Sequence, residues 1–170
     1  MSTANLTRTE TAARSAAITL HRIRLELDVT GSVDAGRSGF PTTSTLEFDA
    51  ATDETWVDFL GEDVQSVTVN GRPQEVRYDG ERIALHGLEE HTDVEIRAPV
   101  NYSRPGEALH RFLDPVDGQT YLYTHDEPAD ARRFMACFEQ PDMKAALTVV
   151  VTAPAGWAVL SNQSAVSTRT

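Results

Sequence analysis

The residues best suited to chemistry lie in one stretch of the chain, from Tyr121 to Asp142, where carboxylates, aromatic side chains and adjacent arginines alternate with turn-forming residues. Glu127 stands directly before Pro128, whose ring fixes its own φ and restricts the preceding residue to extended backbone. A carboxylate at this position would therefore be held rigidly. Polar loops anchored by aromatic residues often carry function. The same composition also fits an ordinary salt-linked connection between strands, so both interpretations are open.

The other reactive side chains of this stretch are interpreted as structural. Arg132 and Arg133 are adjacent and lie among acids, where guanidinium groups can pin a long loop through carboxylate contacts. Cys137 lies between Ala136 and Phe138, which favours a buried thiol over a nucleophile. No G-x-S-x-G motif and no glycine-rich loop before a helix occurs in the sequence. We therefore expect no catalytic residue in this chain.

The histidines do not form a recognisable metal motif. A zinc-protease helix needs H-E-x-x-H, which places two imidazoles one helical turn apart. The segment from His86 to His91 is one residue too long, and Gly87 within it disfavours a helix. A polar loop between strands is the better interpretation, and the lone Cys137 offers no thiolate cluster. We expect no metal ligand and no bound zinc in this chain.

The chain begins with a helix signal and then changes to strand periodicity. Thr7 and Glu10 have the spacing of a capping box, and alanines follow. From Ile18 onward polar and apolar residues alternate, and the apolar set changes parity near His21, which predicts a β-bulge or a strand that changes sheets. The expected organisation is a helical arm over residues 1–17 and a single β-domain over residues 18–170.

Short strands separated by turn residues dominate the rest of the sequence. Asn70-Gly71 is a strong signal for a tight turn, and the apolar run from 145 to 151 predicts a fully buried strand. One or two helical turns are expected from 128 to 134. The resulting fold class is all-β, an antiparallel twisted saddle or sandwich of several sheets with a short N-terminal helix. The other predicted strands are 43–48, 55–59, 64–69, 75–78, 82–85, 93–98, 109–113 and 120–123, with 157–160 closing the pattern.

Composition limits the partners. The 170 residues carry a net charge of −11, which argues against nucleic acid because a phosphate backbone requires a basic surface. The sequence has no apolar run long enough for a membrane span, and the first ten residues are polar, unlike a secretory signal. A single cysteine fits a reducing compartment. We therefore expect a cytoplasmic protein that binds neither nucleic acid nor membrane.

The stretch from 121 to 142 carries a specific set of residues with fixed spacing. They are Tyr121, Thr124, Glu127, Arg132, Arg133, Cys137, Phe138, Glu139, Pro141, Asp142 and Lys144. This pattern resembles the amino-terminal domain of aminopeptidase N-like zinc aminopeptidases, in which Tyr-x-x-Thr-Gln-x-Glu is followed by an arginine pair and then by Cys-Phe-Asp-x-Pro-Asp-x-Lys. Residues 5–8 with the alanines that follow them, 106–118, 152–157 and 161–162 resemble the flanking parts of that domain, so the resemblance covers essentially the whole chain.

The resemblance implies a function and a set of partners. A complete enzyme of this kind releases amino-terminal residues from peptides with a zinc ion, and the zinc and catalytic motifs would lie beyond Thr170, in a catalytic domain of the same chain. In such an enzyme Glu127 would bind the α-ammonium group of the substrate. His125 stands where the family usually has a glutamine, at the wall of the pocket for the first substrate side chain. The 170-residue chain alone is expected to be inactive.

Two alternatives are open. The domain could belong to a non-catalytic relative that uses it as a scaffold for protein interactions. It could also be a free-standing β-sandwich module that binds sugars or proteins, which would have no need for Glu127 within its motif.

Overall fold

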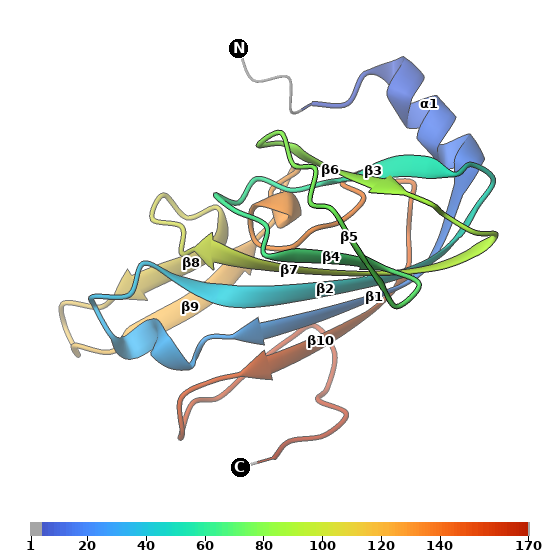
Figure 1. Ribbon diagram of the computed structural model, residues 1–170. Coiled ribbons are helices and arrows are strands. Elements are labelled where there is room, and N and C mark those ends of the chain that lie inside the picture. The colour runs from blue at the N-terminus through green and yellow to red at the C-terminus, as the bar shows by residue number, and fades with distance from the viewer. Residues whose placement is uncertain (1–4, 170) are drawn as a thin grey trace.

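The computed structural model describes residues 5–169, and a six-stranded sheet forms its main layer (Figure 1). The strand order in this sheet is β10-β1-β2-β7-β4-β5, and two-stranded sheets β3–β6 and β8–β9 complete the fold. The helices are α1 (Arg8–Ala17), η1 (Thr30–Val33) and η2 (Ala131–Arg133). The strands are β1 (Ile18–Asp28), β2 (Gly39–Ala50), β3 (Glu54–Asp58), β4 (Ser66–Val69), β5 (Arg72–Gln74), β6 (Arg82–His86), β7 (His91–Asn101), β8 (Ala108–Leu113), β9 (Thr120–His125) and β10 (Ala146–Thr152).

The core lies between the main sheet and a second layer. Strands β2 and β7 pair in antiparallel register and alternate buried and exposed residues along their length. The second layer consists of β3–β6 and the segment around Phe138, whose ring packs edge-on against that of Phe48 on β2 at 5.4 Å. Apolar alternation on the strands therefore explains this layering, because one face of each sheet turns inward.

Several predictions from local pattern are confirmed. Thr7 caps α1 in a reciprocal box with Glu10. The register between β1 and β2 shifts between Leu20 and Arg22, which places the predicted bulge at His21. The all-β class with a short N-terminal helix is confirmed as well, with the addition that β10 runs parallel to β1. In the part of the chain that the structure describes, no helix is long and apolar enough to cross a membrane.

The strand predicted at 75–78 is wrong. The hairpin that turns at Asn70-Gly71 ends already at Gln74, the last residue of β5. The side-chain amide of Gln74 donates to the carbonyl of Ala84 and accepts the N–H of His86. The side chain of Gln74 thus forms hydrogen bonds with backbone groups of β6 that a further strand would otherwise pair with. Residues 75–78 therefore join β6 only through an isolated bridge.

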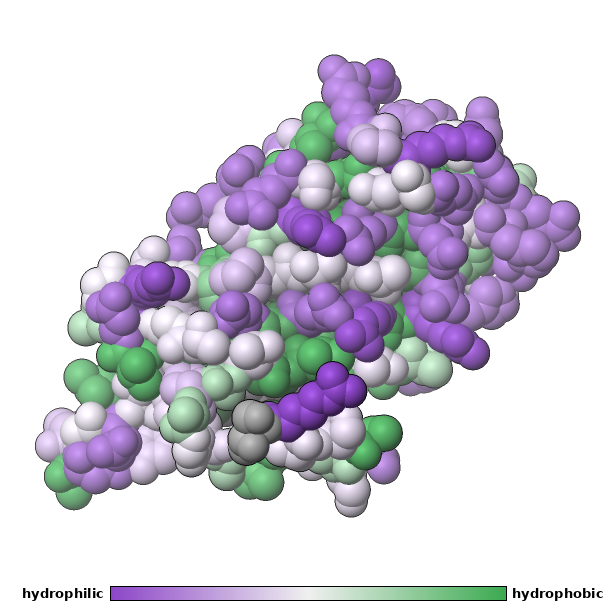
Figure 2. Space-filling view, turned by 60° about the horizontal axis from the view of Figure 1, so that its bottom comes forward, coloured by the Kyte–Doolittle hydropathy of each residue, from purple (hydrophilic) through white to green (hydrophobic). Residues whose placement is uncertain are grey.

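The apolar strand β10 is exposed, contrary to the prediction of a fully buried strand. It lies at the edge of the sheet with β1 as its neighbour, so no described element covers its outer side. The side chains of Leu147 and Val149 are 57% and 46% exposed. Figure 2 turns this side of the molecule forward and shows hydrophobic residues gathered among polar ones. The segment 157–160 forms no strand, and Leu160 in it is also exposed.

Helix α1 is fixed to the β-domain by polar contacts. Arg14 is its one buried residue, and the guanidinium group donates to the carboxylate of Asp58 at 2.9 Å. Glu10 accepts a hydrogen bond from Arg82 of β6 at 2.6 Å and another from the N–H of Thr7 at 2.8 Å. A ten-residue helix is marginal by itself, so these contacts hold α1 in place.

We predict that the contribution of Glu10 to stability depends on pH. The hydrogen bond from Arg82, followed by those from Thr7, lowers the pKa of Glu10 from 4.5 to about 2. The stabilisation is therefore complete above about pH 5 and disappears as the pH falls to about 2. Urea unfolding should show Glu10→Gln to be less stable by roughly 1 kcal/mol at neutral pH, a small figure because the pair is partly exposed. The difference should vanish near pH 2, and an unchanged difference there would contradict this assignment.

Candidate functional site

The candidate site is a loop that follows the hairpin β8–β9, defined here as the motif loop, residues 126–140. Strand β9 ends at His125, which pairs with Ala108 of β8. The N–H of Asp130 donates to the carbonyl of Asp126 at 2.9 Å and closes a turn. Glu127 and Pro128 lie inside this turn, and the peptide bond between them is cis. The turn thus presents Glu127 at the end of the hairpin.

The side chain of Glu127 is exposed, and its carboxylate has no partner among the described residues. Within residues 5–169 its carboxylate has neither a hydrogen bond nor an ion pair, and the nearby arginines are engaged elsewhere. His125 is exposed as well. Burial, more than any neighbouring charge, raises the pKa of the adjacent Asp126, and His125 opposes that shift. The structure therefore places both predicted binding residues at an open surface, with a free carboxylate available to an external cation.

The hairpin adds an aromatic surface beside this turn. Tyr121, Tyr123 and His125 alternate along β9 and so lie on one face of the hairpin. Phe112 pairs directly with Tyr121, and the ring of Tyr123 lies 5.0 Å from that of His110. Tyr121 and Tyr123 are 47% and 49% exposed. This face offers an apolar wall that leads along β9 toward Glu127.

The arginines stabilise the loop, as predicted. Arg132 is buried; its side-chain Nε donates to the carbonyl of Ala129 and its backbone N–H to the carboxylate of Glu139, both at 2.9 Å. Arg133 is exposed and forms an ion pair with Asp130, and its Nη2 lies 3.8 Å from a carboxylate oxygen of Glu107. The two guanidinium groups therefore fix both the interior and the outer side of the loop.

The second half of the motif loop is part of the core. Residues 134–138 are buried, and Cys137 exchanges backbone hydrogen bonds with Asp58 of β3. The N–H of Ala136 donates to the hydroxyl of Ser44 on β2 at 3.0 Å. Burial, ahead of the charges of Glu139 and Asp58, raises the pKa of the Cys137 thiol well above its ordinary value. The interpretation of Cys137 as a structural thiol is confirmed.

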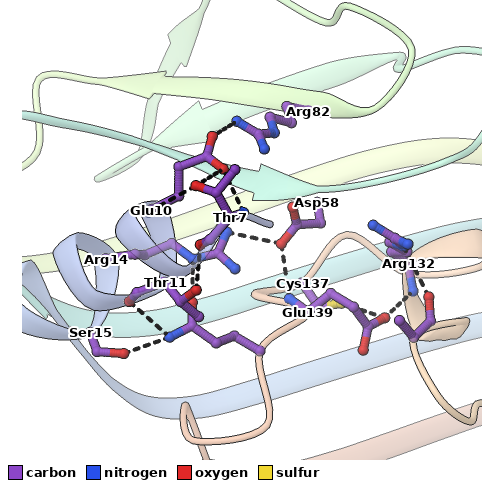
Figure 3. Close-up of polar contacts among 12 residues, drawn as sticks. Thr7, Glu10, Thr11, Arg14, Ser15, Asp58, Arg82, Arg132, Cys137 and Glu139 are labelled. Carbon is purple, nitrogen blue, oxygen red and sulfur yellow. Dashed lines mark hydrogen bonds and ion pairs between the residues drawn. The ribbon is translucent and has the colours of Figure 1, made fainter. Parts of the chain in front are cut away.

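Sequence reasoning missed the residues that support this loop from behind. The carboxylate of Asp58 accepts from Arg14 at 2.9 Å and from the N–H of Glu139 at 3.0 Å (Figure 3). Gln140 accepts from Nε of Arg14 at 3.1 Å and donates to the carbonyl of Thr11. One signal was present in the sequence, because Asp58 is a charged residue between two apolar positions of a predicted strand.

Metal-ligating groups do not converge in the described part of the chain. No set of three or more His, Cys, Asp or Glu side chains there is placed to hold an ion. His86 ends β6 and His91 begins β7. His91 instead lies 2.6 Å from Asp49, whose other oxygen is 3.0 Å from His21. Within residues 5–169, these histidines therefore pair with a carboxylate and do not form a set of metal ligands.

Comparison with known proteins identifies relatives of the whole domain. The family model described as Peptidase M1 N-terminal domain matches residues 7–170. Aminopeptidase N of Streptomyces lividans is 41% identical over 163 residues, which cover 93% of this chain and 19% of that protein. A probable aminopeptidase 1 of Saccharolobus solfataricus is 31% identical over 106 residues, 62% of this chain and 13% of that protein. The chain thus spans about a fifth or less of the length of these relatives.

Solved structures share the fold. Native yeast LTA4 hydrolase matches with a TM-score of 0.66 and 18% identity over 82% of this chain and 23% of that chain. An M1 zinc metallopeptidase from Deinococcus radiodurans matches with a TM-score of 0.61 and 20% identity over 81% of this chain and 33% of that chain.

We predict that the adjacent arginines differ sharply in their contribution to stability. Arg132→Met removes a buried guanidinium group and leaves the carbonyl of Ala129 without its donor, so the free energy of unfolding should fall by about 2–4 kcal/mol. The matched variant Arg133→Met removes an exposed pair and should cost less than about 1 kcal/mol. Denaturant unfolding of both variants measures the difference, and equal losses would contradict the structural assignment.

Proposed function

We propose that this chain, which belongs to the peptidase M1 N-terminal domain family, works within a longer zinc aminopeptidase and binds the amino terminus of the peptide substrate. The observation that carries the proposal is the free carboxylate of Glu127, exposed on a turn that Arg132 fixes through hydrogen bonds to the carbonyl of Ala129 and to the carboxylate of Glu139. The zinc ion and the catalytic residues would be supplied by a catalytic domain of the same polypeptide, because the described residues hold no metal cluster. That domain and peptides are the proposed partners, in the cytoplasm.

A fixed carboxylate explains why such an enzyme would cleave only the first peptide bond. The end of a peptide differs from its interior by the positive charge of the α-ammonium group. A carboxylate at a constant distance from the reacting centre binds this charge and so places one bond, the first, at that centre. Hydrogen bonds to charged groups contribute roughly 1.5–3 kcal/mol, which corresponds to about a ten- to hundredfold effect on the rate.

His125 and the aromatic face of β9 would border the first substrate side chain. An imidazole replaces the amide that the family usually has at this position, and Tyr123 precedes it on the same face. A ring surface favours apolar and aromatic side chains through their buried area. We therefore propose His125 as a specificity residue and Glu127 as the amine anchor, with no catalytic residue in this chain.

We predict that Glu127→Gln in the longer enzyme lowers kcat/KM for an aminoacyl substrate by about ten- to a hundredfold, because the amide keeps the shape but loses the charge. Asp126→Asn is the matched control, since it neutralises the neighbouring carboxylate and should change kcat/KM by less than about threefold. Steady-state kinetics on purified variants measure both. Equal effects of the two substitutions would indicate general attraction of a cation, and an unchanged kcat/KM for Glu127→Gln would exclude Glu127 as the amine anchor.

The exposed side chains of β10 support a proposal for where the rest of the longer protein packs. Leu147 and Val149 on this open edge strand are apolar, and an unpaired apolar edge is otherwise prone to association. We propose that the following part of the polypeptide covers them, and that the exposed aromatic residues of the hairpin face the catalytic domain.

We predict that Leu147→Glu destabilises the longer protein by about 2–4 kcal/mol, since it would bury a charge in place of an apolar side chain. The same substitution in the 170-residue chain should change stability by less than about 0.5 kcal/mol. Val33→Glu is the matched control, because Val33 and Leu147 are both 57% exposed. Thermal unfolding of each protein measures these effects, and a Leu147→Glu variant as stable as the parent in both contexts would exclude the contact.

A further inference from the structure

A continuous set of polar contacts connects helix α1 with the turn that carries Glu127. It starts at Arg14, whose side chain is fully buried and donates to Asp58, itself 1% exposed. The same oxygen of Asp58 accepts the backbone N–H of Glu139 at 3.0 Å. Figure 3 shows these groups in line, with α1 on one side and Arg132 on the other. The position of Glu139 is therefore set by the buried ion pair.

Glu139 also fixes the position of the part of the motif loop that is nearest to Glu127. Its carboxylate accepts the backbone N–H of Arg132 at 2.9 Å. Arg132 in turn donates from Nε to the carbonyl of Ala129, two residues after Glu127. The carbonyl of Arg132 accepts the N–H of Leu60 at 2.7 Å, just beyond the end of β3. The turn is thus held from behind by groups that do not face the surface where Glu127 lies.

Stability alone does not account for this arrangement. A buried ion pair gains little over well-packed apolar residues of similar volume, because both charges lose their hydration. Charged hydrogen bonds are instead directional, and they fix the relative positions of the groups that they join. A carboxylate that sets the distance between the substrate's amino group and the reacting centre must itself be positioned to within about 0.5 Å. This accuracy depends on the hydrogen bonds of the residues that support it.

We propose that Glu139, held by the buried Arg14–Asp58 pair, is a positioning residue for the Glu127 anchor. It acts through the backbone of Arg132 and Ala129 and does not touch the substrate. This inference rests on the proposed function of Glu127. It assigns α1 a role in substrate placement, because Arg14 on that helix fixes the far end of the set of contacts.

The test compares two substitutions of Glu139 in the longer enzyme. Glu139→Gln keeps an oxygen that accepts the N–H of Arg132, whereas Glu139→Leu removes the acceptor at similar size. The leucine variant should lower kcat about tenfold with KM changed by less than about threefold, because a displaced anchor still binds the ammonium group but misplaces the bond. The glutamine variant should remain within about threefold of the parent in both constants.

A double-mutant cycle with Glu127→Gln separates positioning from general damage. If Glu139 acts through Glu127, Glu139→Leu should lower kcat/KM by less than about twofold in the Glu127→Gln background. The same tenfold loss in both backgrounds, or equal losses for the leucine and glutamine variants, would overturn the inference while leaving the anchor intact. If Glu127→Gln itself has no effect, the proposed function fails and the inference fails with it. Should Glu139→Leu not fold, Glu139→Ala, which also removes the acceptor of the Arg132 N–H, replaces it in the same cycle with the same criterion.

Discussion

A carboxylate buried on a strand must be neutralised, and the way Asp58 is neutralised determines how the domain is assembled. Its partner Arg14 comes from the N-terminal helix, so the helix must lie against β3. Its second partner, the N–H of Glu139, comes from the motif loop, so the loop must lie against the same strand end. Removing either member of the Arg14–Asp58 pair would leave the other charge buried and uncompensated, which is far more costly than replacing both by apolar residues. One side chain therefore joins three segments that are distant in sequence.

This arrangement divides the motif loop into an inner part that is structural and an outer part that is available for binding. In its inner part, both the backbone N–H and the side chain of Arg132 donate hydrogen bonds, and Cys137 lies in the core. Its outer part carries Glu127, which has no partner among the described residues. A carboxylate that has no partner, on a turn that is held by hydrogen bonds, keeps both its charge and its position. Those are the properties that recognition of a substrate's amino group requires.

Local pattern in the sequence was sufficient for several local features of the fold. The capping box at Thr7, the bulge at His21 and the turn at Asn70 follow from side-chain spacing, because each depends only on near neighbours. The motif around Glu127 was accessible through its resemblance to a known family. The errors concern neighbours that are distant in sequence. An apolar run such as β10 does not reveal whether another segment covers it, and it proved to be an exposed edge.

The partner of a buried charge is equally invisible in sequence, because Arg14 and Asp58 are separated by 44 positions and no local rule pairs them. Glu127, directly before Pro128, is proposed to hold the ammonium group of the substrate. This proposal concerns one distance, from a carboxylate oxygen of Glu127 to the α-nitrogen of the substrate. It is tested most directly by a crystal structure of the longer enzyme with a bound peptide or free amino acid. The account predicts a carboxylate oxygen of Glu127 within about 2.7–3.2 Å of the ligand's α-nitrogen. A bound ligand whose ammonium group is held by other residues, with Glu127 directed into solvent, would contradict it.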